Sequence, residues 1–218
     1  MADRNFVDLE PEVSASVPGC PQPTILQYVR KIAIEVCEKT LVWRFEHNVM
    51  RLSNGVYEYE YEDVPTDAEV CGVIFAALND SPIANKTQEE IHRLYPAWPS
   101  LSVAARGTPI VYGQFDPDHF VVAPVPDDST TYDMKMFLAL KPSRDATKMA
   151  KTPLDECTDL IVHGVLQHLL LLPGKSWTDH ELASYHAKQY VYKTASRRAN
   201  ANLGVSRTSL SVQMQPFA

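Results

Sequence analysis

The chain lacks the long apolar segments and the cysteine pattern of several protein classes. It has no run of about 18 apolar residues, the length that a membrane-spanning helix requires, and residues 1–10 lack the basic and then apolar order of a signal peptide. The cysteines form no CxxC pair and have no metal-ligand spacing: Cys20, Cys37, Cys71 and Cys157. We therefore expect a protein made in a cytoplasm, with no disulfide framework, whose cysteines mostly pack as small apolar groups.

The common nucleotide-binding and hydrolase motifs are also missing. The chain contains no G-x-S-x-G nucleophile elbow and no glycine fingerprint of a dinucleotide site. Gly174, Lys175 and Ser176 have the order that ends a phosphate-binding loop. However, Leu169 stands where that loop needs its first glycine, and a helical pattern rather than a strand precedes it. The two commonest α/β enzyme classes therefore have no support in the sequence.

Acidic residues outnumber basic ones, 27 to 20, which gives a formal net charge of -7 at pH 7. A protein that binds nucleic acid by neutralising phosphates normally presents a basic face, so this balance argues against that class. An acidic surface would instead let nucleic acid pass without sticking to it. The alternative is that the charge serves solubility alone, as in most acidic proteins.

The clearest pattern lies between residues 152 and 204 and predicts two long helices. Thr152 as N-cap and Pro153 at the first helical position begin the first helix, and Pro173 with Gly174 ends it. Its apolar residues recur at helical spacing: Leu154, Ile161, Val162, Val165, Leu166, Leu169, Leu170 and Leu172. They leave a narrow polar strip, made of His163, Gln167 and His168. Such a helix must be covered on most sides.

The second helix has start and stop signals of its own. Thr178 and Glu181 are spaced as a capping box, with Trp177 and Leu182 at the staple positions. Gly204 is suited to a left-handed cap at the end. The link between the helices is short, which predicts an antiparallel pair.

The N-terminal third begins without periodicity and then becomes helical. Residues 1–23 contain prolines and a glycine in place of a helical pattern: Pro11, Pro18, Gly19, Pro21 and Pro23. We expect an extended arm there. Thr24 then caps an amphipathic helix that runs to about Trp43, with one apolar face: Ile25, Tyr28, Val29, Ile32 and Val36. This helix would pack with the later pair as a bundle of three.

From Phe45 the apolar period changes to that of strands. Asn54 and Gly55 separate two alternating runs in the manner of a tight hairpin. In residues 56–62 the tyrosines fall on one face and the glutamates on the other: Tyr57, Tyr59 and Tyr61 against Glu58, Glu60 and Glu62. The acidic face is interpreted either as a solvated sheet surface or as a wall that faces nucleic acid.

The rest of the middle region predicts more strands and one short helix. Strands are expected at residues 70–78, 109–115, 119–125 and 132–140, the second and third of them paired, and a helix is the alternative for 70–78 because of its alanines. Thr87 and Glu90 form a capping box that starts the short helix, Trp98 anchors the loop after it, and residues 141–151 form a polar link.

The sequence therefore predicts an α+β fold of four parts. These are an extended N-terminal arm (residues 1–23), a helical body (24–44 and 152–204), an inserted antiparallel β domain with one short helix (45–151) and an extended tail (205–218). In the tail, apolar residues alternate as in a strand that docks at a sheet edge or groove: Leu210, Val212 and Met214. A tail without such a partner is the alternative.

No group of residues has the spacing of a catalytic or metal site. His163 and His168 are five apart and His180 and His186 six apart, so neither pair shares a helix face, and each is expected to make a local hydrogen bond. Asp179, with its two neighbours His180 and Glu181, is explained by capping. We expect no enzyme, no cofactor and no metal.

The ordered pattern resembles the head-to-tail adaptor proteins of short-tailed bacteriophages, the tail tubular protein A family, over about residues 24–204. The leading helix and the two final helices match this layout, as do several strand ends and turns: Asp63-Val64-Pro65, the pair at residues 107–112 and 120–126, and Lys141-Pro142. The resemblance implies a non-enzymatic virion subunit, present as a ring that is typically dodecameric. The ring lies between the portal and the tail nozzle or another tail protein, and DNA passes through it.

The family layout also implies roles for segments of this chain. The helices would build the ring body, the β insert would reach toward the tail, and the C-terminal segment would bind the portal. In this sequence the portal-binding residues would be Leu203, Leu210, Val212, Met214 and Phe217. Glu58, Glu60 and Glu62 are candidates to line the channel.

Three other interpretations stay open. The first is a neck or tail-completion protein of a longer-tailed phage. The second is a small soluble enzyme whose site combines Cys157 and His163 with groups from the β insert. The third is a monomeric binding module that uses the tyrosine face at residues 57–61.

Overall fold

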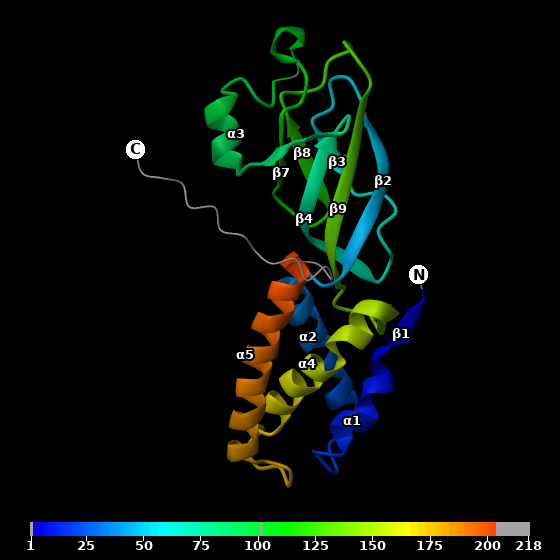
Figure 1. Ribbon diagram of the computed structural model, residues 1–218, viewed down its shortest axis with the longest axis vertical. Coiled ribbons are helices and arrows are strands. Elements are labelled where there is room, and N and C mark those ends of the chain that lie inside the picture. The colour runs from blue at the N-terminus through cyan, green and yellow to red at the C-terminus, as the bar shows by residue number, and fades with distance from the viewer. Residues whose placement is uncertain (1, 101, 204–218) are drawn as a thin grey trace.

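The computed structural model describes residues 2–100 and 102–203, which adopt a mixed α+β fold. The long helices lie at one end of the molecule, the helical half: α2 (Gln22–Thr40), α4 (Lys151–Leu169) and α5 (His180–Leu203), with the short α1 (Glu10–Ser14) beside them. The two larger sheets and α3 (Gln88–Leu94) lie at the other end, the β half (Figure 1). Within the described ranges, none of the helices combines the length and apolar content that crossing a membrane requires.

The N-terminal segment is packed and not extended, so the predicted arm is wrong. The segment forms β1 (Asp3–Asn5), the 3-10 helix η1 (Phe6–Leu9) and α1, and β1 pairs antiparallel with β10 (Lys148–Ala150). Four of its apolar side chains are buried: Phe6, Leu9, Val13 and Val17. Their spacing of three and four residues is that of one helix face, which the neighbouring prolines obscure. The pairing of β10 also corrects the predicted polar link.

Helix α2 confirms the predicted apolar face, but it begins earlier than predicted. Ile25, Val29 and Ile32 are buried against the rest of the helical half. The N-cap is Pro21, and the N–H of Thr24 donates to the Pro21 carbonyl, so Thr24 is not the cap. The helix ends at Leu41, which takes the left-handed conformation in place of glycine.

Gly164 of α4 lets this helix approach α2 and α5 closely. A Cβ atom at this position would lie 2.5 Å from Ile32 Cγ2 and 2.9 Å from Tyr190 Cε2, closer than carbon atoms can pack. The hydroxyl of Tyr190 donates to Glu35 Oε1 at 3.0 Å, which links α5 to α2. Glycine is therefore required where the three helices contact one another.

The starts of α4 and α5 differ from the predicted caps. Helix α4 follows Ala150, so Thr152 lies inside its first turn and makes no cap. Helix α5 is capped by Asp179, whose Oδ1 accepts the N–H of Leu182 at 2.9 Å. The predicted capping box is wrong because the hydroxyl of Thr178 instead donates to the Leu172 carbonyl within the connection, and Leu182 is exposed. The candidate cap Gly204 lies outside the described residues.

The β half contains two four-stranded sheets. One has the order β2 (Arg44–Leu52), β9 (Tyr132–Pro142), β4 (Ala68–Leu78) and β5 (Ser81–Pro82), with antiparallel neighbours. The other has the order β3 (Glu58–Glu60), β8 (His119–Ala123), β7 (Val111–Gln114) and β6 (Ala84–Asn85), in which the short β6 is parallel to β7. The predicted strands are present, and the predicted pairing of β7 with β8 is confirmed.

The predicted hairpin around Asn54 and Gly55 is wrong. The chain does turn there, since Gly55 has φ 76°, but β2 pairs with β9 and β3 pairs with β8. The turn is held from outside: the Gly55 N–H donates to the Pro126 carbonyl, and Arg106 Nη1 donates to Asn54 Oδ1 at 2.8 Å. The turn therefore connects two sheets and not two paired strands.

Two local predictions in the β half are confirmed. Thr87 and Glu90 form the capping box of α3, each side chain bonding the other residue's backbone N–H. Trp98 is buried after this helix, and its Nε1 donates to the Val122 carbonyl at 3.0 Å. The loop is thereby anchored to β8.

Gly164→Ala tests the helix packing. The added methyl group must displace Ile32 or Tyr190, and overpacking costs about 1–3 kcal/mol, of which alanine's better helix propensity offsets ~1 kcal/mol. We expect chemical denaturation to give a free energy of unfolding lower by up to about 2 kcal/mol. Gly72→Ala is the matched control, because a Cβ there has no heavy atom within 4 Å. An equal loss in both variants would contradict the role of Gly164.

Candidate interaction surfaces

The exposed carboxylates of β3 and its flanking residues form an acidic strand face. Glu58, Glu60 and Glu62 are all exposed, while the tyrosines between them are half-buried. The predicted alternation of the two faces is therefore confirmed. Among the described residues, no ion pair involves Glu58 or Glu62.

The tyrosine side of the strand fixes its position on the β half. The ring of Tyr59 stacks on Phe120 at a centroid distance of 5.5 Å. Its hydroxyl accepts the Ser53 N–H at 3.0 Å and donates to the Val56 carbonyl at 2.8 Å. Tyr57 packs edge-on against Trp98. The acidic face is thus held on a rigid base, although only three residues of the strand pair with β8.

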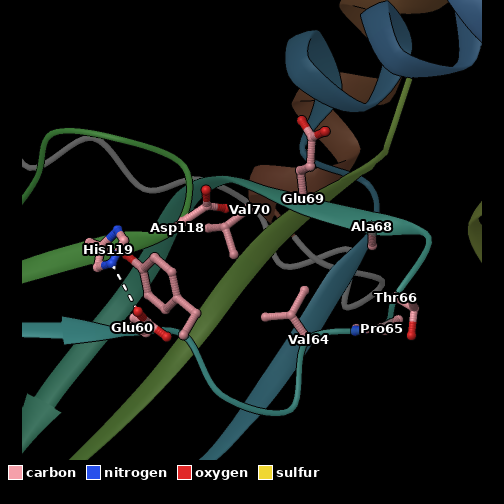
Figure 2. A pocket seen from close by; sticks show the side chains of 10 residues that line it. Glu60, Val64, Pro65, Thr66, Ala68, Glu69, Val70, Asp118 and His119 are labelled. Carbon is pink, nitrogen blue, oxygen red and sulfur yellow. Dashed lines mark hydrogen bonds and ion pairs between the residues drawn. The ribbon is translucent and has the colours of Figure 1, made fainter. Parts of the chain in front are cut away.

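Figure 2 shows a cavity of about 410 Å³ beside the acidic strand face. It lies between the end of β3, the segment Val64 to Thr66, the start of β4 and the turn before β8. Glu60, Glu69 and Asp118 are among its lining residues, and no lysine or arginine is among the described ones. The Glu69 carboxylate points away from Glu60 in Figure 2 and pairs with Lys141 at 3.7 Å. The cavity therefore extends the acidic surface inward, toward the second sheet.

His119 joins the acidic strand face to the turn before β8. Its Nε2 lies 3.3 Å from Glu60 Oε1, as Figure 2 shows, and its Nδ1 lies 3.2 Å from Asp116 Oδ1. Desolvation acts to lower the pKa of His119, but the hydrogen bonds from Asp116 and Glu60 outweigh it and raise the pKa above its ordinary value. Protonated His119 bridges two carboxylates and weakens the negative charge of this surface.

An NMR titration of the imidazole tests this bridge. We expect the pKa of His119 to lie above the ~6.5 of an unperturbed histidine and to fall toward it in Glu60→Gln. Because the folded state holds the proton more tightly, the bridge stabilises the fold at low pH. This contribution is lost as the pH rises through the raised pKa. Glu58→Gln, on the same strand, should leave the titration unchanged. A wild-type pKa of His119 at or below ~6.5 would contradict the bridge.

A pair of histidines lies between α4 and α5. His163 Nδ1 is 2.8 Å from His186 Nδ1, so one ring donates a proton to the other. Tyr185 packs edge-on against both rings, at centroid distances of 6.3 and 5.3 Å. Burial lowers the pKa of both histidines, and nearby Lys193 lowers that of His163 further. The lowered pKa values favour the neutral form of both rings, and the shared hydrogen bond requires that the accepting Nδ1 carry no proton.

The sequence interpretation missed this pair because it compared spacings within each helix. His163 and His186 are 23 residues apart on antiparallel helices, so the expected local hydrogen bonds are wrong for both. His168 is also not locally bonded through its ring; it stacks on Tyr28 of α2. The signal available in sequence was the narrow polar strip of the first helix, which had to face a polar group on its partner.

The histidine pair makes stability depend on pH. With both pKa values below the ~6.5 of an unfolded histidine, the unfolded state binds more protons, so stability falls as the pH drops through about 6.5. For each proton bound, the free energy of unfolding changes by at most ~1.4 kcal/mol per pH unit. We expect thermal unfolding of His163→Gln to be less sensitive to acid than that of the wild type. His180→Gln, at the exposed start of α5, should match the wild type. Equal acid sensitivity of His163→Gln and wild type would contradict this role.

The residues considered for catalysis are buried, hydrogen-bonded to other residues or used as helix caps. Cys157 is buried in the helical half, and burial raises the pKa of its thiol to about 11. His163 is engaged with His186, and Asp179 caps α5. A nucleophile and base need a reactive thiolate within hydrogen-bond reach of the base, which this arrangement does not supply. Across the described ranges, no three or more His, Cys, Asp or Glu residues gather as metal ligands would.

The predicted portal-binding residues lie at the C-terminal end of the chain. Leu203 is the last residue of α5, and this end of the helix adjoins the β half, where Arg44 donates to the carbonyl of Ala201. The other predicted residues lie outside the described part of the chain: Leu210, Val212, Met214 and Phe217.

Comparison with known proteins identifies no family for this arrangement. No protein-family model matches the chain, and a search of curated proteins gives no match. The case for a function therefore depends on the residues and surfaces described above.

Proposed function

We propose that this chain is a structural head-to-tail connector subunit of a short-tailed bacteriophage. It would form a ring, dodecameric as in the family that it resembles, between the portal and the tail, through which DNA passes. The observation that carries the proposal is the order of the elements. A β half of two sheets is inserted between α2 and α4, and the long α5 returns to the junction of the two halves (Figure 1).

Each part of the molecule has a place in this proposal. The helical body, with α2, α4 and α5 in mutual contact, builds the ring, and the β half reaches toward the tail nozzle or another tail protein. The segment after α5 binds the portal through Leu203, Leu210, Val212, Met214 and Phe217. The last turn of α5 lies at the junction of the two halves, where Arg44 donates to the Ala201 carbonyl, and this segment follows it in the sequence.

The acidic strand face would line the DNA channel. Glu58, Glu60 and Glu62 point away from the sheet core, and Glu60 meets His119 and not a lysine or arginine. Carboxylates repel phosphates, so DNA would slide past this surface without being held. The net charge of the chain favours the same behaviour.

Truncation before Val205 tests the portal-binding segment. The buried core residues lie between Phe6 and Tyr190, before this point, so we expect the shortened protein to remain folded, with an unchanged circular-dichroism spectrum and thermal midpoint. Attachment to portal-bearing capsids should be lost, measured by co-sedimentation. The full chain with Val103→Ser, an exposed position in the β half, is the control and should co-sediment. Normal attachment of the truncated protein would remove this segment from the mechanism.

Gold labelling of Met1-tagged protein in purified phage particles locates the subunit. Label at the vertex between head and tail is expected. Label along or at the far end of a long tail would instead identify a neck or tail-completion subunit, the alternative within phage. Absence of the protein from particles would contradict the proposed function and favour an enzyme or a monomeric binding module.

A further inference from the structure

Helix α5 presents an exposed apolar face away from the rest of the molecule. Tyr185 and Tyr192, seven residues apart, are 52% and 73% exposed, while Ala183, His186 and Tyr190 are buried toward α4 and α2. Residues separated by seven lie on one side of a helix, so the two tyrosines form a continuous stripe. We call the surface formed by Tyr185, Lys188 and Tyr192 the α5 outer face.

The α5 outer face lies in a basic environment. The helix carries four basic residues and one acidic residue: Lys188, Lys193, Arg197 and Arg198, against Glu181. Two of the basic residues are used within the subunit, where Lys193 pairs with Asp159 at 3.3 Å and Arg197 with Glu156 at 3.4 Å. Lys188 and Arg198 are exposed and have no ion pair among the described residues. Lys188 lies between the two tyrosines on this face, and the exposed Glu181, four residues before Tyr185, adds one negative charge at its start.

The opposite side of the helical half is acidic. Figure 1 places β1 and α1 on one side of this half and α5 on the other, with α4 between them. Residues 2–21 contain four acidic residues and one basic residue: Asp3, Asp8, Glu10 and Glu12, against Arg4. Arg4 forms ion pairs with Asp155 and Asp8, and Glu10 accepts a hydrogen bond from the neutral side chain of Gln22. Glu10 and Glu12 therefore keep their negative charge uncompensated. We call this side, residues 2–21, the α1 side.

The α1 side also has an apolar recess. A cavity of about 140 Å³ lies between η1 and α2, and Val7 is 42% exposed at its edge. Phe6, Val7 and Leu26 form its apolar lining, and Asn5, Arg30 and Thr147 complete it, with Arg30 donating to the Arg144 carbonyl. Exposed apolar surface bordered by charge is typical of a protein contact. One side of the helical half therefore offers tyrosines beside Lys188, and the other offers a partly apolar recess together with Glu10 and the exposed Glu12 of the same segment.

We propose that the α5 outer face of one copy docks on the α1 side of the next copy. The inference rests on the proposed ring and names the surfaces that build it. Two different surfaces of one chain that fit each other give a head-to-tail contact, which closes into a ring when the rotation permits. Tyr185 and Tyr192 supply the buried aromatic contact, and Lys188 and Arg198 face Glu10 and Glu12.

Carbodiimide cross-linking tests the contact directly, because it joins an amine to a carboxylate that touches it. Equal amounts of unlabelled and ¹⁵N-labelled full-length protein are mixed, cross-linked in solution at high concentration, and digested for mass spectrometry. We expect peptides that join Lys188 of one isotope to Glu10 or Glu12 of the other. The same linkage is expected in neck material isolated from particles.

Charge reversal with rescue provides the second measurement. Lys188→Glu with Arg198→Glu places negative charge against negative charge, and we expect about a tenfold weaker association by sedimentation velocity. Glu10→Lys with Glu12→Lys should do the same. Mixing the two double variants makes both contacts between unlike copies attractive, because the reversed α5 face meets the reversed α1 side and the native α5 face meets the native α1 side. Alternating assemblies longer than a dimer should therefore form in the mixture, while neither double variant should assemble alone. Tyr192→Ser should weaken association without changing charge, while Val103→Ser, an exposed apolar residue of the β half, should not.

The outcomes separate this inference from the proposed function. Assemblies whose cross-links join other surfaces, and which the charge variants leave intact, would overturn the docking surfaces while a ring remains. A chain that is monomeric in solution and absent from particles would overturn both. Binding of a DNA oligonucleotide that Lys188→Glu with Arg198→Glu abolishes, without any interchain cross-link, would overturn the docking surfaces and assign the α5 outer face to nucleic acid.

Discussion

The close contact of Gly164 with Ile32 and Tyr190 sets how the three long helices pack, and the β half is inserted between two of them. This contact brings α4 against both α2 and α5, which the hydroxyl of Tyr190 reinforces by bonding Glu35. The end of α2 and the start of α4 thereby meet at one end of the helical half, and the whole β half begins and ends there. An insertion held at a single junction keeps its sheets intact while the helices remain available for contacts with other subunits.

Acidic and basic residues are distributed unevenly over the two halves of the molecule. The proposed function depends on this distribution. The acidic strand face and its cavity lie in the β half, where His119 between Glu60 and Asp116 partly offsets the carboxylates. The helical half has a basic side on α5 and an acidic side at the N-terminal segment. Such polarity has little value within one copy, because these sides face away from each other (Figure 1). In the proposed ring, where copies stand side by side, the basic side of one copy would face the acidic side of the next.

The sequence predicted what local periodicity controls and missed what packing controls. The apolar face of α2, the capping box at Thr87 and the alternation through residues 56–62 depend on neighbours in the chain, and all three were predictable. The partners of β2 and β3 come from strands more than 50 residues away, so the Asn54 turn alone suggested a hairpin that does not form. The histidine pair at His163 depends on how two helices rotate against each other, which spacing within one helix does not encode. The acidic face was thus predictable, and the α5 outer face was not.

The central claim is that this chain acts as a ring between a capsid and a tail. Negative-stain class averages of the Met1-tagged protein, isolated gently from infected cells so that bound partners are kept, test it most directly. The account predicts closed rings attached to capsid vertices. Each ring should have a central opening, and the class averages should show how many subunits it contains. Single particles of one chain's size, with no capsid attached under any isolation condition, would contradict it.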